Sequence, residues 1–170
     1  MDLPRIRGTA RRLISRLWPN TGLVRSIVGR FYPWDLRPCP DWKSSRLAGR
    51  YGEAVAACHL ARAGLRVLVR NFQARGGEID LIVRHGTELV MVEVKTRHMR
   101  AKMAPEHSVT WIKQRKIIAT ANAYLRELAG RPPPVRFDIV EVSYESRTLP
   151  RVRWIRGAFS LQEAGFTWSR

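Results

Sequence analysis

Two stretches near the middle of the chain, residues 77–83 and 89–95, alternate apolar and polar positions with a period of two. This period is typical of β-strands that bury one face. The short link between them carries a glycine, Gly86, at the first central position of a two-residue hairpin turn. We therefore predict a β-hairpin in which Gly86 and Thr87 form the turn.

This turn determines which residues of the hairpin lie opposite each other. Counting back from it, Asp80 lies opposite Glu93, and Glu78 lies opposite Lys95. Directly opposed residues share a sheet face, with Cβ atoms about 5 Å apart. Two carboxylates so placed repel each other unless a cation lies between them, whereas Glu78 and Lys95 would form an ion pair. The pattern thus predicts a cation site at Asp80 and Glu93, although a bulge in the hairpin would change this register.

Apolar residues recur at helical spacing on both sides of the hairpin. The first helix is predicted to begin at Ser45, with Ser44 or Ser45 as its N-cap, and to end at Gly64. The second is predicted from about His107 to Ala129, before a glycine and three prolines. The positions expected along the inner stripe are Leu47, Tyr51, Ala54, Val55, Cys58 and Ala61 in the first helix, and Val109, Ile112, Lys116, Ile117, Thr120, Ala121, Tyr124, Leu125 and Leu128 in the second.

Further strands are predicted at residues 65–72 and 135–142, with a short fifth strand as an option at residues 152–155. The expected order of elements is α-β-β-β-α-β. This order predicts a single α/β layer with a mixed sheet. Asp138, on the fourth strand, is expected to anchor local structure by pairing with Arg136 or a neighbouring strand.

The chain of 170 residues is long enough for one domain with a sizeable core. We place this domain at residues 45–162. Residues 1–44 form a basic, Arg-rich and aromatic extension that prolines interrupt, and we expect it to be partly disordered. Residues 163–170 form a C-terminal tail.

The chain carries 31 Lys and Arg against 14 Asp and Glu, which gives a formal net charge of +17. This excess is spread over the extension, the domain and the tail. It favours a polyanionic partner, either nucleic acid or an anionic membrane surface. No apolar run approaches the roughly 20 residues that cross a membrane, and the two cysteines lack metal-type spacing. We therefore expect a cytoplasmic protein.

The two opposed acids fit the chemistry of a hard divalent cation such as Mg²⁺ or Mn²⁺, which prefers carboxylate oxygens and keeps several waters. The backbone carbonyl of Val94 could supply a third oxygen. Lys95 lies two residues from Glu93 and points to the same face, where its ammonium can stabilise a phosphodiester or orient the attacking water. A metal-bound hydroxide needs no side-chain base. The residues therefore predict metal-assisted phosphodiester hydrolysis.

Glu78-Ile79-Asp80 followed by Glu93-Val94-Lys95 resembles the core of the restriction-endonuclease-like (PD-(D/E)XK) nucleases. A fuller pattern, over about residues 46–162, is similar to the YraN family of bacterial proteins, which is similar in turn to archaeal Holliday junction resolvases. The residues that carry it are Gly49–Ala56, Asn71, Gly77–Ile82, Val92–Arg97, Lys113, Gln114, Arg136–Asp138 and Ile155–Phe159.

The resemblance implies a restriction-endonuclease-like fold, a central mixed sheet of four to five strands with flanking helices. It implies that Asp80 and Glu93 are metal ligands and that Lys95 is the catalytic lysine. Glu53, on the first helix, matches an additional acid at the metal site. The usual proline before the first acid is absent, since Ile79 precedes Asp80.

Basic and polar residues after the second acidic strand and on the second helix are candidates for contacts with nucleic acid. They are Arg97, Arg100, Lys102, Lys113 and Gln114. The alternative for these residues is ordinary surface charge. The alternative for the two acids and Lys95 is an ion-pair cluster on a solvated sheet face.

The predicted function is metal-dependent endonuclease action on DNA, including branched or structured DNA. One alternative is a non-catalytic nucleic-acid-binding module on the same scaffold. Another is a membrane-surface or assembly factor that acts through residues 1–44. Resolvase-like relatives act as dimers, so the resemblance also makes a homodimer an option, although no residue pattern specifies its interface.

Overall fold

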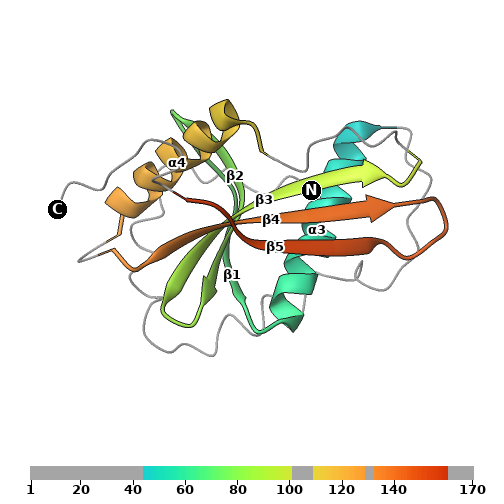
Figure 1. The fold of residues 1–170 in the computed structure, drawn as a ribbon, viewed down its shortest axis with the longest axis horizontal. Helices are drawn as coiled ribbons and strands as arrows, with labels where there is room; N and C mark the ends of the chain where they lie inside the picture. The colour runs from blue at the N-terminus through green and yellow to red at the C-terminus, as the bar shows by residue number, and fades with distance from the viewer. Residues whose placement is uncertain (1–43, 101–108, 129–131, 161–170) are drawn as a thin grey trace, which may run out of the picture.

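The computed structural model describes residues 44–100, 109–128 and 132–160, and the expectations for residues 1–43, Lys102 and the C-terminal tail lie outside these ranges. The described elements follow the order α-β-β-β-α-β-β (Figure 1). Their bounds are α3 Ser45–Arg62, β1 Arg66–Ala74, β2 Gly77–His85, β3 Glu88–His98, α4 Trp111–Arg126, β4 Val135–Tyr144 and β5 Arg151–Phe159. The order differs from the expected one by its last strand, which is much longer than the short segment that the sequence suggested.

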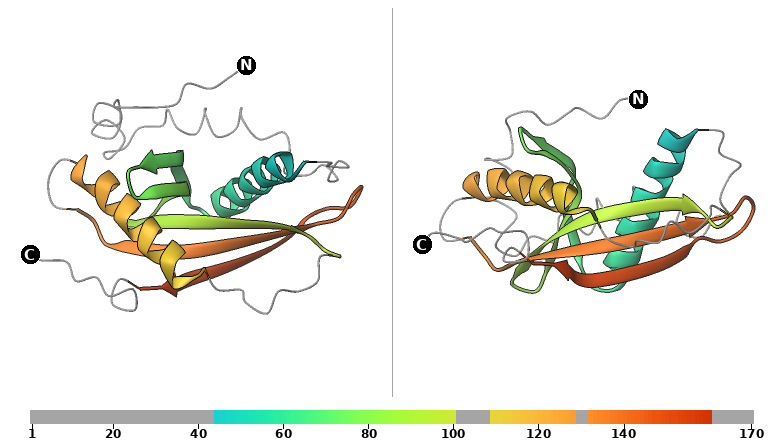
Figure 2. Two further views of the ribbon diagram at one scale, coloured as in Figure 1. Left: turned by 90° about the horizontal axis from the view of Figure 1, so that it is seen from above. Right: turned by 45° about the horizontal axis from the view of Figure 1, so that its top comes forward.

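The five strands form one mixed sheet in the order β1-β2-β3-β4-β5. Strands β3 and β4 are parallel and α4 connects them, whereas the other neighbouring pairs are antiparallel. Helix α4 lies toward one end of the sheet and α3 toward the other (Figures 1 and 2). The predicted α/β class with a mixed sheet is confirmed. No helix in the described ranges is long and apolar enough to cross a membrane.

The register predicted for the hairpin is confirmed near its turn. His85 pairs with Glu88, and the same register continues to Leu81 and Val92. Gly86 adopts a positive φ of 58°, which the turn requires and which glycine tolerates. The paired ladder of β2 and β3 ends at Leu81, one residue before the two acids would meet as a regular pair.

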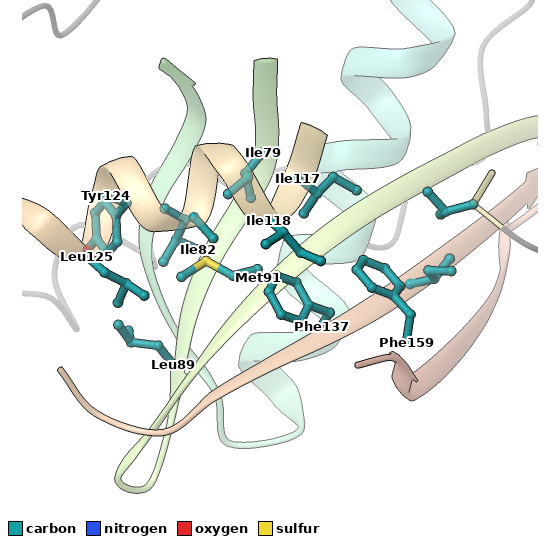
Figure 3. Close-up of a cluster of buried hydrophobic side chains, with 13 residues drawn as sticks. Ile79, Ile82, Leu89, Met91, Ile117, Ile118, Tyr124, Leu125, Phe137 and Phe159 are labelled. Carbon is teal, nitrogen blue, oxygen red and sulfur yellow. The ribbon is translucent and has the colours of Figure 1, made fainter. Parts of the chain in front are cut away.

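Buried apolar side chains form two clusters, one beneath each helix. Alternate residues of β3 supply both, because Met91 points to the α4 side and Val92 to the α3 side. Figure 3 shows the α4 cluster, in which Ile118 of α4 lies beside Met91 and Phe137. In the other cluster, Leu60 of α3 packs with Val92. The two faces of the sheet are therefore each closed by one helix.

Helix α3 begins where the sequence predicted, and Gly64 follows its last turn with a positive φ of 86°. Gly52 faces β3 so closely that a Cβ atom there would lie 1.7 Å from Thr96 Oγ1. Only glycine permits this approach, which sets the position of the neighbouring Glu53.

Three positions of the predicted inner stripes are wrong. Leu47 of α3 and both Ile112 and Lys116 of α4 are exposed rather than buried. Ala48 of α3 is buried in place of its neighbour Leu47. Helical spacing identifies a stripe, but the edge of the stripe that the sheet covers depends on how the helix is rotated on the sheet.

Candidate active site

Asp80 and Glu93 lie on the sheet face that α4 covers. The ammonium of Lys113, on α4, lies 3.2 Å from Glu93 Oε2, and its charge also favours the ionised form of Asp80. Asp80 does not continue the ladder. Instead, the backbone N–H of Val94 donates a hydrogen bond of 2.7 Å to Asp80 Oδ2. The two acids therefore come from neighbouring strands to one place, although not as a regular cross-strand pair.

The pKa of Asp80 is raised to about 7, first by burial and then by the charge of Glu93. The hydrogen bond from Val94 and the charge of Lys113 oppose this rise, and the charge of Glu53 adds to it. The folded chain thus holds a carboxyl group whose ionised form is unfavourable unless a further positive charge lies beside it.

Glu93 is only 5% exposed. The ammonium of Lys95 donates a hydrogen bond of 2.9 Å to Glu93 Oε1, while Lys113 approaches the other carboxylate oxygen. Both lysines are partly open to solvent. A buried carboxylate under two accessible ammonium groups differs from the ion-pair cluster on a solvated face that was the alternative.

Glu78 and Lys95, both within described strands, have different partners, so the predicted ion pair between them is wrong. The carboxylate of Glu78 accepts hydrogen bonds from Gln73 and Asn71 of β1, at 3.3 and 3.4 Å. The reason is that β2 leaves β3 before this point and stays paired with β1.

The side chain of Asn71 also donates a hydrogen bond of 2.9 Å to Glu53 Oε2. Asn71 adopts a positive φ of 48°, a conformation that asparagine tolerates better than most residues. The pKa of Glu53 is raised, first by burial, while the hydrogen bond from Asn71 lowers it. The Asn71 amide thus holds the Glu53 carboxylate on the side of the site formed by α3, β1 and β2.

Within the described ranges, no three His, Cys, Asp or Glu side chains gather closely enough to hold a metal ion. The fit to a divalent cation therefore depends on Asp80 and Glu93. The approach of Lys113 does not complete a hydrogen bond to Glu93 Oε2, and this buried oxygen has no other partner among the described groups. Two carboxylates with one unsatisfied oxygen suit a hard cation that keeps most of its water ligands.

Arg97 and Arg153 lie on the same face of the sheet, on either side of Glu141. The register places Lys95 and Arg153 on opposite sides of Glu141. Buried Glu141 Oε2 lies 3.3 Å from an Arg97 nitrogen and 3.7 Å from an Arg153 nitrogen. The side chains of Lys95 and Arg97 on β3 and of Arg153 on β5 thus form a basic row on the sheet face that carries the acidic pair.

The remaining predicted contacts with nucleic acid lie in different settings. Arg100 forms an ion pair of 2.8 Å with Glu145. The amide of Gln114 donates a hydrogen bond of 2.8 Å to the carbonyl of Val109 and so holds the segment that enters α4. Lys113 stands at the acidic pair itself.

The Uncharacterised protein family UPF0102 matches residues 52–142, more than half of the chain. The chain belongs to the UPF0102 family. The resemblance to YraN proteins that the sequence suggested is therefore confirmed.

Curated relatives in the UPF0102 family share substantial identity with this chain. It is 46% identical to the UPF0102 protein of Symbiobacterium thermophilum, over 68% of this chain and 98% of the relative. It is 42% identical to that of Cupriavidus pinatubonensis, over 74% and 96%. For Geobacter sulfurreducens the identity is 39%, over 69% and 91%. The names of these relatives state no activity.

Two charged residues of this UPF0102 chain have settings that differ from the predicted site list. Buried Asp138 accepts hydrogen bonds from Arg136, from the indole of Trp154 and from the backbone of Gly157, so its predicted anchoring role is confirmed. Arg153 was not predicted as a site residue. Its place became visible only with the pairing of β5 and β4, which sets it beside Glu141.

Proposed function

We propose that this protein is a metal-dependent endonuclease that hydrolyses phosphodiester bonds in DNA, including branched or structured DNA, on a restriction-endonuclease-like fold. The observation that carries the proposal is the acidic pair of partly buried Asp80 and buried Glu93, with the accessible ammonium of Lys95 beside it. The order of the first six elements and the Glu93-Val94-Lys95 sequence on β3 support the fold assignment.

In this proposal Asp80 and Glu93 bind Mg²⁺ or Mn²⁺, and the backbone carbonyl of Val94 is a third ligand. When bound, such an ion supplies Lewis acidity and a water of lowered pKa. Glu53, held by Asn71, lies close enough to affect the charge of Asp80 and acts through that charge.

Lys95 has the role of stabilising the scissile phosphate. Its ammonium is bound to Glu93 on one side and open to solvent on the other, so it can contact a phosphate oxygen without leaving the site. A cation at this point stabilises the charge that develops on the transferring phosphate. Lys113 contributes a second positive charge at the opposite oxygen of Glu93.

The basic row of Arg97 and Arg153 is the proposed path of the nucleic-acid backbone. Glu141 keeps the two guanidinium groups in place while part of each remains exposed. Guanidinium groups bind phosphate oxygens in a fixed geometry. This binding releases the counterions that are condensed on the nucleic acid, which favours the complex. Arg100 and Gln114 remain proposed contacts beyond this row, and a homodimer remains an expectation from the family resemblance.

The second candidate function is a nucleic-acid-binding module without catalysis. The observation that favours it is that the ammonium groups of Lys95 and Lys113 lie at the two oxygens of Glu93 and balance its charge. Under this alternative the acids would serve only to position the lysines.

A cleavage assay tests this proposal: the protein is incubated with linear duplex, single-stranded and four-way-junction DNA in the presence of Mg²⁺ or Mn²⁺. We expect cleavage by the wild type, no cleavage by Asp80→Asn or Glu93→Gln, and retained DNA binding by both variants. Lys95→Ala should lose cleavage but keep metal binding. Glu127→Gln, an exposed acid at the end of α4, is the matched control and should cleave normally. Binding without cleavage of any DNA would favour the second candidate instead.

A further inference from the structure

The start of α4 presents two large apolar side chains to solvent. Trp111 is 54% exposed and Ile112 is 65% exposed. Helical spacing assigned Ile112 to the inner stripe with Ile117, yet it faces outward while Ile117 is buried. Single exposed apolar residues are common on proteins, whereas two adjacent large ones directly before Lys113 form a surface that a partner can cover.

The ring of Trp111 is held by a cation. The guanidinium carbon of Arg115 lies 4.6 Å from the centroid of the Trp111 ring, a cation–π arrangement. Thr110 accepts a hydrogen bond from the backbone N–H of Lys113 and so fixes the first turn of the helix. The indole therefore has a defined orientation and still keeps more than half of its surface accessible.

Lys113 connects this surface to the acidic pair. It follows Trp111 and Ile112 directly in the sequence, and its ammonium lies 3.2 Å from Glu93 Oε2. One helical turn thus carries an aromatic ring, an exposed aliphatic side chain and a cation that reaches the candidate active site.

A nucleotide matches this combination of groups. Its phosphate suits Lys113, and its base offers a flat π-face for stacking on an aromatic ring. In a continuous duplex the base faces are occupied by neighbouring base pairs. Only an unpaired base, in a single strand, a bulge or a branch, can offer a face to a protein side chain.

We propose that Trp111, backed by Arg115 and flanked by Ile112, stacks on an unpaired nucleobase beside the phosphate at the Asp80–Glu93 site. This inference rests on the proposed function and narrows its substrate class. The preferred DNA has unpaired nucleotides at the position that the acidic pair would cleave. A protein partner that covers the same apolar surface is the competing occupant.

The test measures binding in EDTA and in Ca²⁺, so that cleavage does not complicate it. Two DNAs are compared, a continuous duplex and the same duplex with one unpaired 2-aminopurine. We expect Trp111→Ala to weaken binding of the bulged DNA by about 5- to 150-fold, the range typical of losing one stacked base. Binding of the continuous duplex should stay unchanged, and Trp111→Phe should retain most of the preference.

The matched control is Leu149→Ala. Leu149 is 57% exposed and lines a cavity of about 300 Å³ with Cys58 and His59 of α3, away from α4. This variant should bind both DNAs as the wild type does. The 2-aminopurine emission should be quenched by the wild type and by Leu149→Ala, but not by Trp111→Ala.

Equal weakening of both DNAs by Trp111→Ala, or weakening of neither, would overturn the stacking surface and leave the proposed nuclease function intact. A wild type that binds neither DNA in either buffer would overturn both. Thermal unfolding of each variant shows whether a loss of binding reflects a loss of folded protein.

Discussion

The carboxylate of Asp80 accepts a hydrogen bond from the backbone N–H of Val94, which lies one residue beyond Glu93 on the neighbouring strand. This bond forms just beyond the point where the ladder of β2 and β3 ends. It orients Asp80 toward β3 without regular pairing and keeps two mutually repelling carboxylates on one face.

Asp80 should make the metal-free protein less stable as the pH rises. Its pKa is about 7 in the folded chain and 3.8 as a model value, so the folded state binds this proton more tightly than the unfolded state. The stabilisation is complete below about pH 4 and is lost by about pH 7, a change of roughly 4 kcal/mol. Glu93, Glu53 and Lys113 are the charged groups that affect Asp80.

Asp80→Asn tests this effect, because the amide stays neutral at every pH. In EDTA it should unfold at higher denaturant concentration than the wild type at about pH 8, and the difference should shrink toward about pH 4. Glu127→Gln should follow the wild-type profile. A wild type and an Asp80→Asn variant with parallel pH profiles would show that Asp80 is not destabilised by burial.

Glu53 should be less important for metal binding than the other two acids. It is held by Asn71 and is not part of any group of three metal-binding side chains in the described chain. We expect Glu53→Gln to weaken Mn²⁺ binding less than Asp80→Asn or Glu93→Gln does, and by no more than the roughly 10- to 100-fold that is typical of losing an outer-shell partner. Calorimetric titration measures this, and a complete loss of binding would instead make Glu53 a direct ligand.

Arg97 and Arg153 should contribute to DNA affinity through charge alone. Replacing either by Ala should weaken binding by a similar factor for every DNA sequence and reduce the slope of log K against log salt by about 1. Arg126→Ala, in the last turn of α4, is the control for loss of one positive charge elsewhere. If the slope of log K against log salt is unchanged in the Arg97 and Arg153 variants, the proposed path of the nucleic-acid backbone is wrong.

Gly52→Ala should destabilise the fold, because its Cβ would lie 1.7 Å from Thr96 Oγ1. A loss of about 1–3 kcal/mol in the free energy of unfolding is expected from such overpacking. Gly49→Ala on the same helix has no atom within 4 Å of its new Cβ and should instead stabilise the protein by up to about 1 kcal/mol. Denaturant unfolding of both variants compares the two sites, and an equal effect would exclude the close contact as the cause.

The sequence predicted the local part of this fold well. The register near the hairpin turn followed from Gly86 and Thr87, because a two-residue turn leaves no freedom in counting. The predicted register is wrong at Glu78, because the separation of β2 from β3 is set by the pairing of β2 with β1 and by the hydrogen bond between Val94 and Asp80. No short-range pattern encodes that separation.

Charged and exposed residues were harder to predict than strands and helices. Arg153 belongs to a strand whose register with β4 is not set by a short turn, so no local pattern predicts its place beside Glu141. Ile112 fits the helical stripe by spacing, but the rotation of α4 on the sheet leaves it outside. The place of Arg153 and the exposure of Ile112 therefore depend on tertiary packing rather than on the periodicity of the sequence.

The most direct test of the central claim is a calorimetric titration of Mn²⁺ into the metal-free wild type, Asp80→Asn and Glu93→Gln, with Glu127→Gln as control. If Asp80 and Glu93 hold one cation together, the wild type and the control bind a single ion per chain, and each of the other two variants binds it at least about tenfold more weakly. Wild-type affinity in either variant, or no binding by the wild type, would contradict a shared cation at these two acids.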